Sequence, residues 1–124
     1  MGYLIDTNIL SELQKGERAD PSVRAWYDRV EVRDLYLSVL VIGEVRQGIE
    51  RLRRRDPAQA DRLTQQLVSI KTDFADRILP ISMAVAERWA RNNVPDALPV
   101  IDGLLAATAQ VHDLTLVTRN VPAM

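Results

Sequence analysis

The sequence predicts an α/β fold, a three-layer α/β/α sandwich around a central, mostly parallel sheet. Three observations lead to this prediction. Short apolar segments alternate with longer segments whose apolar residues recur at helical spacing. Strands separated by helices form βα units, which give parallel sheets with helices on both faces. Finally, 124 residues, 47% of them hydrophobic, suffice for one core, and we expect a single domain over residues 1–124.

Four apolar segments are strand candidates. They cover residues 2–5, 35–37, 78–81 and 114–117. The third candidate contains Pro80, which has no N–H to donate to a neighbouring strand. We therefore expect the third strand to be short, or Pro80 to lie near its end.

Capping residues mark the starts of several helices. Asp20–Pro21 and Asp56–Pro57 each combine a capping carboxylate with a proline at the first helical position. Ser38 and Ser82 are capping residues before two further apolar segments of helical spacing. The expected helices cover residues 7–15, 21–30, 39–52, 57–74, 83–92 and 100–111.

The composition argues against several classes of protein. The chain has no cysteine, which rules out a disulfide framework and a thiolate metal site. No apolar run has the length that spans a bilayer, and residues 1–6 lack the basic leader of a signal peptide. We therefore expect a soluble cytoplasmic protein with no membrane partner. The chain also has no Gly-rich phosphate loop and no Ser–His pair, so neither a P-loop enzyme nor a serine hydrolase is supported.

Charge is balanced overall but unevenly distributed. With 16 basic and 17 acidic residues, the chain lacks the basic character typical of a nucleic-acid-binding protein. One short stretch is nevertheless rich in arginine, and it contains Arg46, Arg51, Arg53, Arg54 and Arg55. Two interpretations remain open. The stretch is either a solvated helix end, where basic residues suit the helix dipole, or an edge that contacts nucleic-acid phosphates.

Three carboxylates stand in surroundings that do not suit an isolated charge. Asp6 directly follows the first strand, Glu44 lies in an apolar helix start, and Asp102 lies among apolar and small residues. Each also has an ordinary structural explanation. Asp6 can cap the next helix, and Asp102 can be an acid favoured at a helix N-terminus. Glu44, which we expect to be largely buried, can belong to an ion pair with Arg46 or another arginine.

The position of these carboxylates relative to the sheet favours a shared site. Each lies near a helix start, and in a parallel α/β sheet the helix starts lie at the carboxyl edge of the strands. Carboxylates that converge there repel one another unless a cation joins them. An oxygen-only ligand set suits Mg²⁺ or Mn²⁺ rather than Zn²⁺, and such an ion can promote attack by water at phosphorus.

Other polar residues are weaker candidates. His112, the only histidine, lies at a helix end, where we expect a structural role. Thr118 and Asn120 follow the last strand candidate, at the same edge as the acids. They could bind a water or a phosphate, or simply form a turn. Glu12 is expected on the surface of the first helix.

At these residues the chain resembles the PIN-domain family and, within it, the VapC/FitB-like toxins of type II toxin–antitoxin systems. The opening motif, Leu4-Ile5-Asp6-Thr7-Asn8-Ile9-Leu10-Ser11-Glu12, would be weak alone. The ordered set of matching segments is specific, because it has the family's spacing and spans nearly the whole chain. These segments are residues 4–12, 38–44, 98–109 and 116–120.

The resemblance implies an endoribonuclease that depends on Mg²⁺ or Mn²⁺ and often cleaves tRNA or rRNA. It implies a homodimer and a cognate antitoxin whose tail blocks the acidic pocket, and therefore a toxin–antitoxin hetero-oligomer. Asp6, Glu44 and Asp102 match the positions of the family's core acids. Thr118 or Asn120 would be accessory ligands, and the arginines between residues 46 and 55 would guide the RNA.

One departure from the family pattern concerns the residues after position 118. Family members often have a further Asp near the position of Ala123, and often a final strand beyond it. We therefore expect no second metal site and a domain without its C-terminal strand. The departure leaves one alternative open, a non-catalytic PIN-like module that binds RNA or an antitoxin through a degraded metal site.

Two other enzyme-like interpretations are disfavoured. A receiver-like phosphoacceptor needs an acidic pair beside Asp6 and a lysine after the last strand, and the chain has neither. A phosphatase of the haloacid dehalogenase type needs an Asp at position 8, where this chain has Asn8.

Overall fold

Four parallel strands form the centre of the structure, a computed structural model in which residues 1–118 are described. The strands are β1 (Tyr3–Ile5), β2 (Leu35–Ser38), β3 (Ile78–Leu79) and β4 (Thr115–Val117). Their order across the sheet is β3-β2-β1-β4, and each pairing is parallel. The prediction of a mostly parallel sheet is thus confirmed, and the described strands are all parallel.

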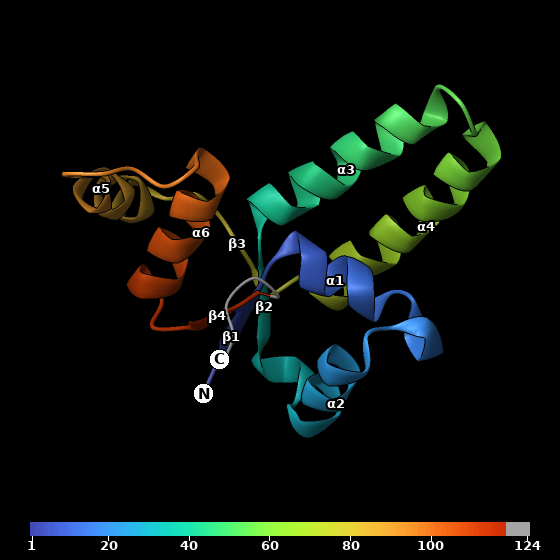
Figure 1. Ribbon diagram of the computed structural model, residues 1–124, viewed down its shortest axis with the longest axis horizontal. Coiled ribbons are helices and arrows are strands. Elements are labelled where there is room, and N and C mark those ends of the chain that lie inside the picture. Colours follow the sequence, from blue (N-terminus) through green and yellow to red (C-terminus); the bar gives the residue numbers. More distant parts are fainter. Residues whose placement is uncertain (119–124) are drawn as a thin grey trace.

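Helices cover both faces of this sheet (Figure 1). They are α1 (Thr7–Leu13), α2 (Pro21–Arg29), α3 (Val39–Arg53), α4 (Pro57–Asp73), α5 (Met83–Asn92) and α6 (Val100–Val111), with short 3-10 helices η1 (Gly16–Arg18) and η2 (Val32–Asp34). On one face, α6 contacts β1 and β4, and α5 packs against α6. The other face carries α1 and α2, which pack against each other. Within residues 1–118, none of the helices combines the length and apolarity that a bilayer crossing requires.

The helix starts form as the capping pattern predicts. The side chains of Asp20, Ser38, Asp56 and Ser82 each accept a hydrogen bond from a backbone N–H in the first turn of the next helix. These bonds satisfy donors that a helix start otherwise leaves unpaired. Because capping is a local interaction, the sequence specifies where these helices begin.

Two element ends differ from the prediction by two residues, and several others differ by one. β3 has only two residues and lies at the edge of the sheet, directly before Pro80. Since proline cannot donate to a neighbouring strand, the strand stops there. α1 ends at Leu13, before Lys15, and Gly16 then begins η1 with φ at +61°, a backbone conformation that suits glycine.

The main core surrounds the two central strands. Leu4, Ile5 and Leu37 are completely buried. Side chains alternate between the two faces of a strand, so Tyr3 and Ile5 share a face. On that face the Tyr3 ring meets Trp26 of α2 edge-on, with the ring centroids 5.4 Å apart. The burial of these side chains holds the helices against the sheet.

A second apolar cluster joins α3 to α4 away from the sheet. Ile49, Ala60 and Leu67 form it and are at most 1% exposed. Arg53 of α3 reinforces the contact through an ion pair with Asp61 of α4, with N and O atoms 2.7 Å apart. Figure 1 shows the two helices as an antiparallel pair that extends beyond the sheet. This α3–α4 hairpin therefore has a small core of its own.

Glu12 is buried, at 6% exposed, so its expected position on the helix surface is wrong. The turn at Gly16 brings the chain back over α1. As a result the Glu12 carboxylate accepts a hydrogen bond from the backbone N–H of Asp20, at 2.6 Å, and another from Lys15, at 3.1 Å. These donors compensate for the burial of the charge. Glu12 thus ties the end of α1 to the start of α2.

Candidate functional site

Asp6 and Asp102 line one cavity at the carboxyl edge of the sheet. Asp6 follows β1, and Asp102 lies in the first turn of α6. The volume of this acidic cavity is about 240 Å³. Its lining residues are Asp6, Asn8, Leu98, Asp102, Leu105, Ala106, Leu116 and Thr118. The predicted convergence of helix starts on this edge therefore brings two of the three predicted acids into one cavity.

Two hydrogen bonds fix the position of Asp6. Its Oδ1 atom accepts from the backbone N–H of Ile9, at 2.9 Å, and thereby caps α1. Its own backbone N–H donates to the carbonyl of Val117 in β4, at 3.3 Å. The structural explanation of Asp6 as a cap is thus confirmed. The cap uses only Oδ1, so the same carboxylate can still offer an oxygen to a ligand.

Asp102 is exposed, and it lies where the dipole of α6 favours a negative charge. No side chain caps this helix start, which Pro99 precedes. The next residue, Gly103, packs closely against α5, because a Cβ there would lie 3.1 Å from the indole of Trp89. This close approach of α5 and α6 fixes the position of the turn that carries Asp102.

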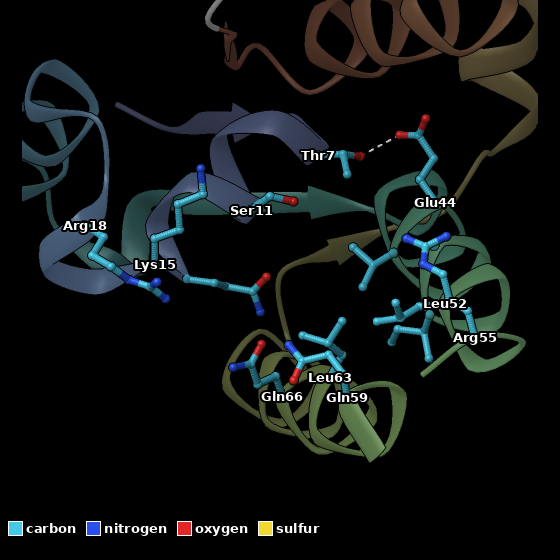
Figure 2. A pocket seen from close by; sticks show the side chains of 14 residues that line it. Thr7, Ser11, Lys15, Arg18, Glu44, Leu52, Arg55, Gln59, Leu63 and Gln66 are labelled. Carbon is cyan, nitrogen blue, oxygen red and sulfur yellow. Dashed lines mark hydrogen bonds between the residues drawn. The ribbon is translucent and has the colours of Figure 1, made fainter. Parts of the chain in front are cut away.

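Glu44 lines a second and larger cavity, and it is only half-buried. Its expected burial is wrong because the start of α3 is not covered all round, and Val39 is 41% exposed. The Oε1 atom of Glu44 accepts a hydrogen bond from the Thr7 hydroxyl, at 2.5 Å (Figure 2). Arg46 does not pair with it, and lies instead 3.5 Å from Glu50. A neutral hydroxyl therefore takes the place of the suggested arginine.

The three predicted acids are thus divided between two cavities. Thr7 connects them, because it follows Asp6 in the chain and bonds to Glu44. Among residues 1–118, no three acidic or histidine side chains lie close enough to hold one ion together. Asp6 and Asp102 line one cavity. Glu44 lines the other, and its hydrogen bond to Thr7 links it to the residue that follows Asp6.

The donors of the acidic cavity suit a hard divalent cation. They are the carboxylates of Asp6 and Asp102, the hydroxyl of Thr118 and the amide of Asn8, with no cysteine or histidine. Mg²⁺ commonly binds one or two protein carboxylates together with waters and phosphate oxygens. This oxygen-rich donor set suits a hard divalent cation better than Zn²⁺, which favours Cys and His ligands. Asn120, the other expected accessory ligand, lies outside the described residues, and His112 is exposed at the end of α6.

The larger cavity lies between α1, α3 and α4, and its volume is about 550 Å³ (Figure 2). We call it the polar groove, because hydroxyl, amide and cationic side chains supply much of its lining. These side chains are Thr7, Ser11, Gln14, Lys15, Arg18, Arg55, Gln59 and Gln66, and Glu44 lies among them. Apolar side chains from α3 and α4, including Ile49 and Leu63, complete it.

The arginines between residues 46 and 55 do not act as one cluster. Arg46 and Arg53 both pair with Glu50, at 3.5 Å, and a hydrogen bond with Asp61 raises the pKa of Arg53. Arg46 thus pairs within α3, whereas Arg53 also joins α3 to α4. Arg51 and Arg54 are exposed and do not line the polar groove. Of the five, only Arg55 does.

Lys15 and Arg18 also line this groove, and neither is among the residues predicted from the sequence. The sequence carries a signal for the α1 side of the groove, in the spacing of the polar residues along α1. Thr7, Ser11 and Gln14 recur every three or four residues, which places them on one helical face, whereas Arg18 lies beyond the turn at Gly16. Gln59, Leu63 and Gln66 show the same spacing on α4.

Comparison with known proteins finds relatives along nearly the whole chain. Residues 3–121 match the PIN domain family. Toxin FitB of Neisseria gonorrhoeae is 33% identical over 124 residues, covering 94% of this chain and 86% of FitB. VapC ribonuclease Y4jK of Sinorhizobium fredii is 31% identical over 125 residues, with the same coverage of each chain.

Solved structures share the fold. The crystal structure of FitAcB from Neisseria gonorrhoeae superposes with a TM-score of 0.83 at 34% identity, covering 94% of this chain and 86% of that chain. A toxin–antitoxin complex from Klebsiella pneumoniae has a TM-score of 0.71 at 28% identity, covering 98% of this chain and 88% of that chain. The family match, the identities over most of the chain and the shared architecture agree, and this chain belongs to the PIN-domain family.

Proposed function

We propose that this chain is a metal-dependent endoribonuclease that acts as the toxin of a toxin–antitoxin pair. The observation that carries the proposal is the acidic cavity, where Asp6 and Asp102 meet at the carboxyl edge of the sheet. Glu44 lies beside it, bonded to Thr7. Relatives described as a toxin and as a ribonuclease, each matching 94% of this chain, support the same activity.

Asp6 and Asp102 would hold Mg²⁺ or Mn²⁺, with Thr118 as an accessory ligand and Glu44 beside them. A bound ion would supply positive charge at the scissile phosphate. The protein's own groups provide the rest. The cap bond to Ile9 holds Asp6 in place, and the α5–α6 contact holds Asp102. Glu44 can accept the proton of the attacking water, since Thr7 occupies only its Oε1 atom.

The proposed partners are an RNA substrate and a cognate antitoxin. The similar toxin–antitoxin complex from Klebsiella pneumoniae supports an antitoxin. The family resemblance suggests tRNA or rRNA as the substrate, and a homodimer that joins the antitoxin in a hetero-oligomer in the cytoplasm.

A second candidate is a PIN-like module that binds RNA or an antitoxin without cleavage. Two observations favour it. No three acids cluster closely within residues 1–118, and the chain has Ala123 where the family often has a further acid.

Cleavage of total tRNA by the purified, antitoxin-free protein distinguishes the two candidates. The reaction is run with Mn²⁺, with Mg²⁺ and with EDTA. We expect cleavage that needs the metal and is lost in Asp6→Asn and Asp102→Asn. Asp96→Asn is the matched control, because Asp96 is an exposed acid close in sequence to Asp102 and does not line the acidic cavity. If the protein binds RNA but cleaves none with Mn²⁺ or with Mg²⁺, the result favours the binding module.

A further inference from the structure

We propose that the polar groove binds the sugar–phosphate backbone of single-stranded RNA, with Arg18 and Arg55 as its phosphate contacts. This inference rests on the proposed nuclease function and deepens it, because it says where the RNA lies beyond the cleavage site. It also narrows the expectation that all the arginines between residues 46 and 55 guide the RNA.

Arg18 and Arg55 are available for phosphates. Within residues 1–118, neither guanidinium forms an ion pair, whereas Arg46 and Arg53 both pair with acidic side chains. Lys15, the third cation of the groove, lies 3.1 Å from the buried carboxylate of Glu12, which offsets its charge. Cations without acidic partners in a groove attract phosphate groups and release counterions when the groups bind.

The lining between these arginines suits a nucleic-acid backbone. Figure 2 shows Lys15 and Arg18 on one side of the groove and Arg55 on the other, with Gln59 and Gln66 between them. Glutamine amides both donate and accept hydrogen bonds, so they can bind phosphate oxygens and ribose hydroxyls of any sequence. The groove therefore offers charge at its sides and neutral hydrogen-bonding groups along its floor.

The groove begins at the candidate catalytic residues. Thr7 and Glu44 line it, and Thr7 directly follows Asp6 of the acidic cavity. An RNA strand whose scissile phosphate lies at Asp6 and Asp102 can thus continue past Thr7 into the groove. The phosphates that follow would then meet Arg18 and Arg55. Continuity with the cleavage site, together with the two unpaired cations, favours RNA over a protein partner as the occupant.

Gly48 of α3 allows charge to be added to the groove without crowding. It lines the groove, and a Cβ at this position would meet no atom within 4 Å. Gly48→Lys should therefore strengthen RNA binding, and Gly48→Glu should weaken it. Gly43 is equally open but does not line the groove, so Gly43→Lys is the matched control.

The test measures binding of a fluorescein-labelled, single-stranded RNA by anisotropy in EDTA, where metal-dependent cleavage cannot occur. We expect Arg18→Gln and Arg55→Gln each to weaken binding about fivefold. Each should also reduce the slope of log affinity against log salt by about 0.7. Arg54→Gln removes the same charge from an exposed neighbour outside the groove and should change affinity by less than about twofold.

Three outcomes would overturn the inference. Equal losses in Arg54→Gln and Arg55→Gln, or equal gains in Gly43→Lys and Gly48→Lys, would show that the groove has no special role. Unchanged RNA affinity in the Arg18 and Arg55 variants, with lost affinity for poly-glutamate, would assign the groove to an acidic protein segment. After any of these outcomes, RNA cleavage by the same protein samples in Mn²⁺ would still support the proposed nuclease function. Absence of both RNA binding and cleavage in the unsubstituted protein would remove the inference and the proposed function together.

Discussion

At the scale of single residues, Thr7 has a position that no other residue of the site shares. Its backbone continues from Asp6, its side chain lines the polar groove, and its hydroxyl donates to Glu44. The bond joins residues 37 positions apart in the chain. It restricts the Glu44 side chain without adding a charge, and leaves the second carboxylate oxygen to accept a proton.

Thr7→Val removes this donor while it keeps the shape of the side chain. Loss of a hydrogen bond to a charged group costs about 1.5 kcal/mol or more, so we expect kcat for RNA cleavage to fall about tenfold. KM should change little, since the phosphate contacts remain. Thr7→Ser should restore most of the rate. Steady-state kinetics check this, and equal impairment of the Ser and Val variants would contradict the positioning role.

Two glycines should respond in opposite ways to alanine. Gly48→Ala adds a methyl group in open space within a helix, and should raise the free energy of unfolding by about 0.5–1 kcal/mol. In Gly103→Ala the new methyl would lie 3.1 Å from the indole of Trp89 and push α5 from α6. We expect a loss of about 1 kcal/mol or more there. Chemical denaturation measures the free energy of unfolding of both variants. A Gly103→Ala protein more stable than the unsubstituted protein would contradict the prediction.

The exposure of individual acids was the least predictable property from sequence. Asp6 could be placed because it follows a strand and begins a helix, which are both local features. The burial of Glu12 depends on the turn at Gly16, which returns the backbone N–H of Asp20 to it. The partial exposure of Glu44 depends on the gap between α1 and α3. Both are consequences of tertiary packing that the apolar pattern around each residue does not contain.

At the scale of elements, the caps determine where helices begin. Asp56 illustrates this for α4, since its carboxylate accepts from the backbone N–H of Gln59 at 3.1 Å. Asp56→Ala should lower the free energy of unfolding by about 1 kcal/mol, because that N–H loses its partner. Asp56→Asn keeps an acceptor and should lose much less. Thermal denaturation of the two variants compares them, and equal losses would mean that charge rather than capping matters here.

The elements and their order could be predicted because strands, caps and helical spacing depend on residues that are close together in the sequence. Their mutual placement could not. The polar face of α1 and the polar face of α4 are each readable from spacing, but only the fold brings both into one groove with Arg55. For the same reason the sequence shows the arginine-rich stretch as one unit, although ion pairs with Glu50 and Asp61 engage two of its members.

At the scale of the whole molecule, the structure has two separate apolar clusters of unequal size. The larger surrounds the central strands, and the smaller holds the α3–α4 hairpin through Ile49, Ala60 and Leu67. The hairpin supplies two of the three walls of the polar groove. The stability of the smaller cluster therefore determines how rigid these two walls of the groove are.

Native-state hydrogen exchange should reveal this division. Opening of a region with few buried apolar contacts needs less free energy than global unfolding. We expect the amides of residues 50–62 to exchange through a partial opening, and those of β1 to exchange only when the whole chain unfolds. Leu67→Ala should lower the protection of the hairpin more than that of β1. Equal protection in both regions would show that the two clusters unfold together.

The pairing of β1 with β4 has a consequence for the order of events on the ribosome. Tyr3, Leu4 and Ile5 pair with residues 115–117, and the N–H of Asp6 reaches the carbonyl of Val117. The first acid is therefore made early in translation, but the strand that anchors it is made more than 100 residues later. A nascent chain that still lacks β4 cannot complete the acidic cavity. For the proposed nuclease, this order postpones RNA cleavage until β4 has been synthesised.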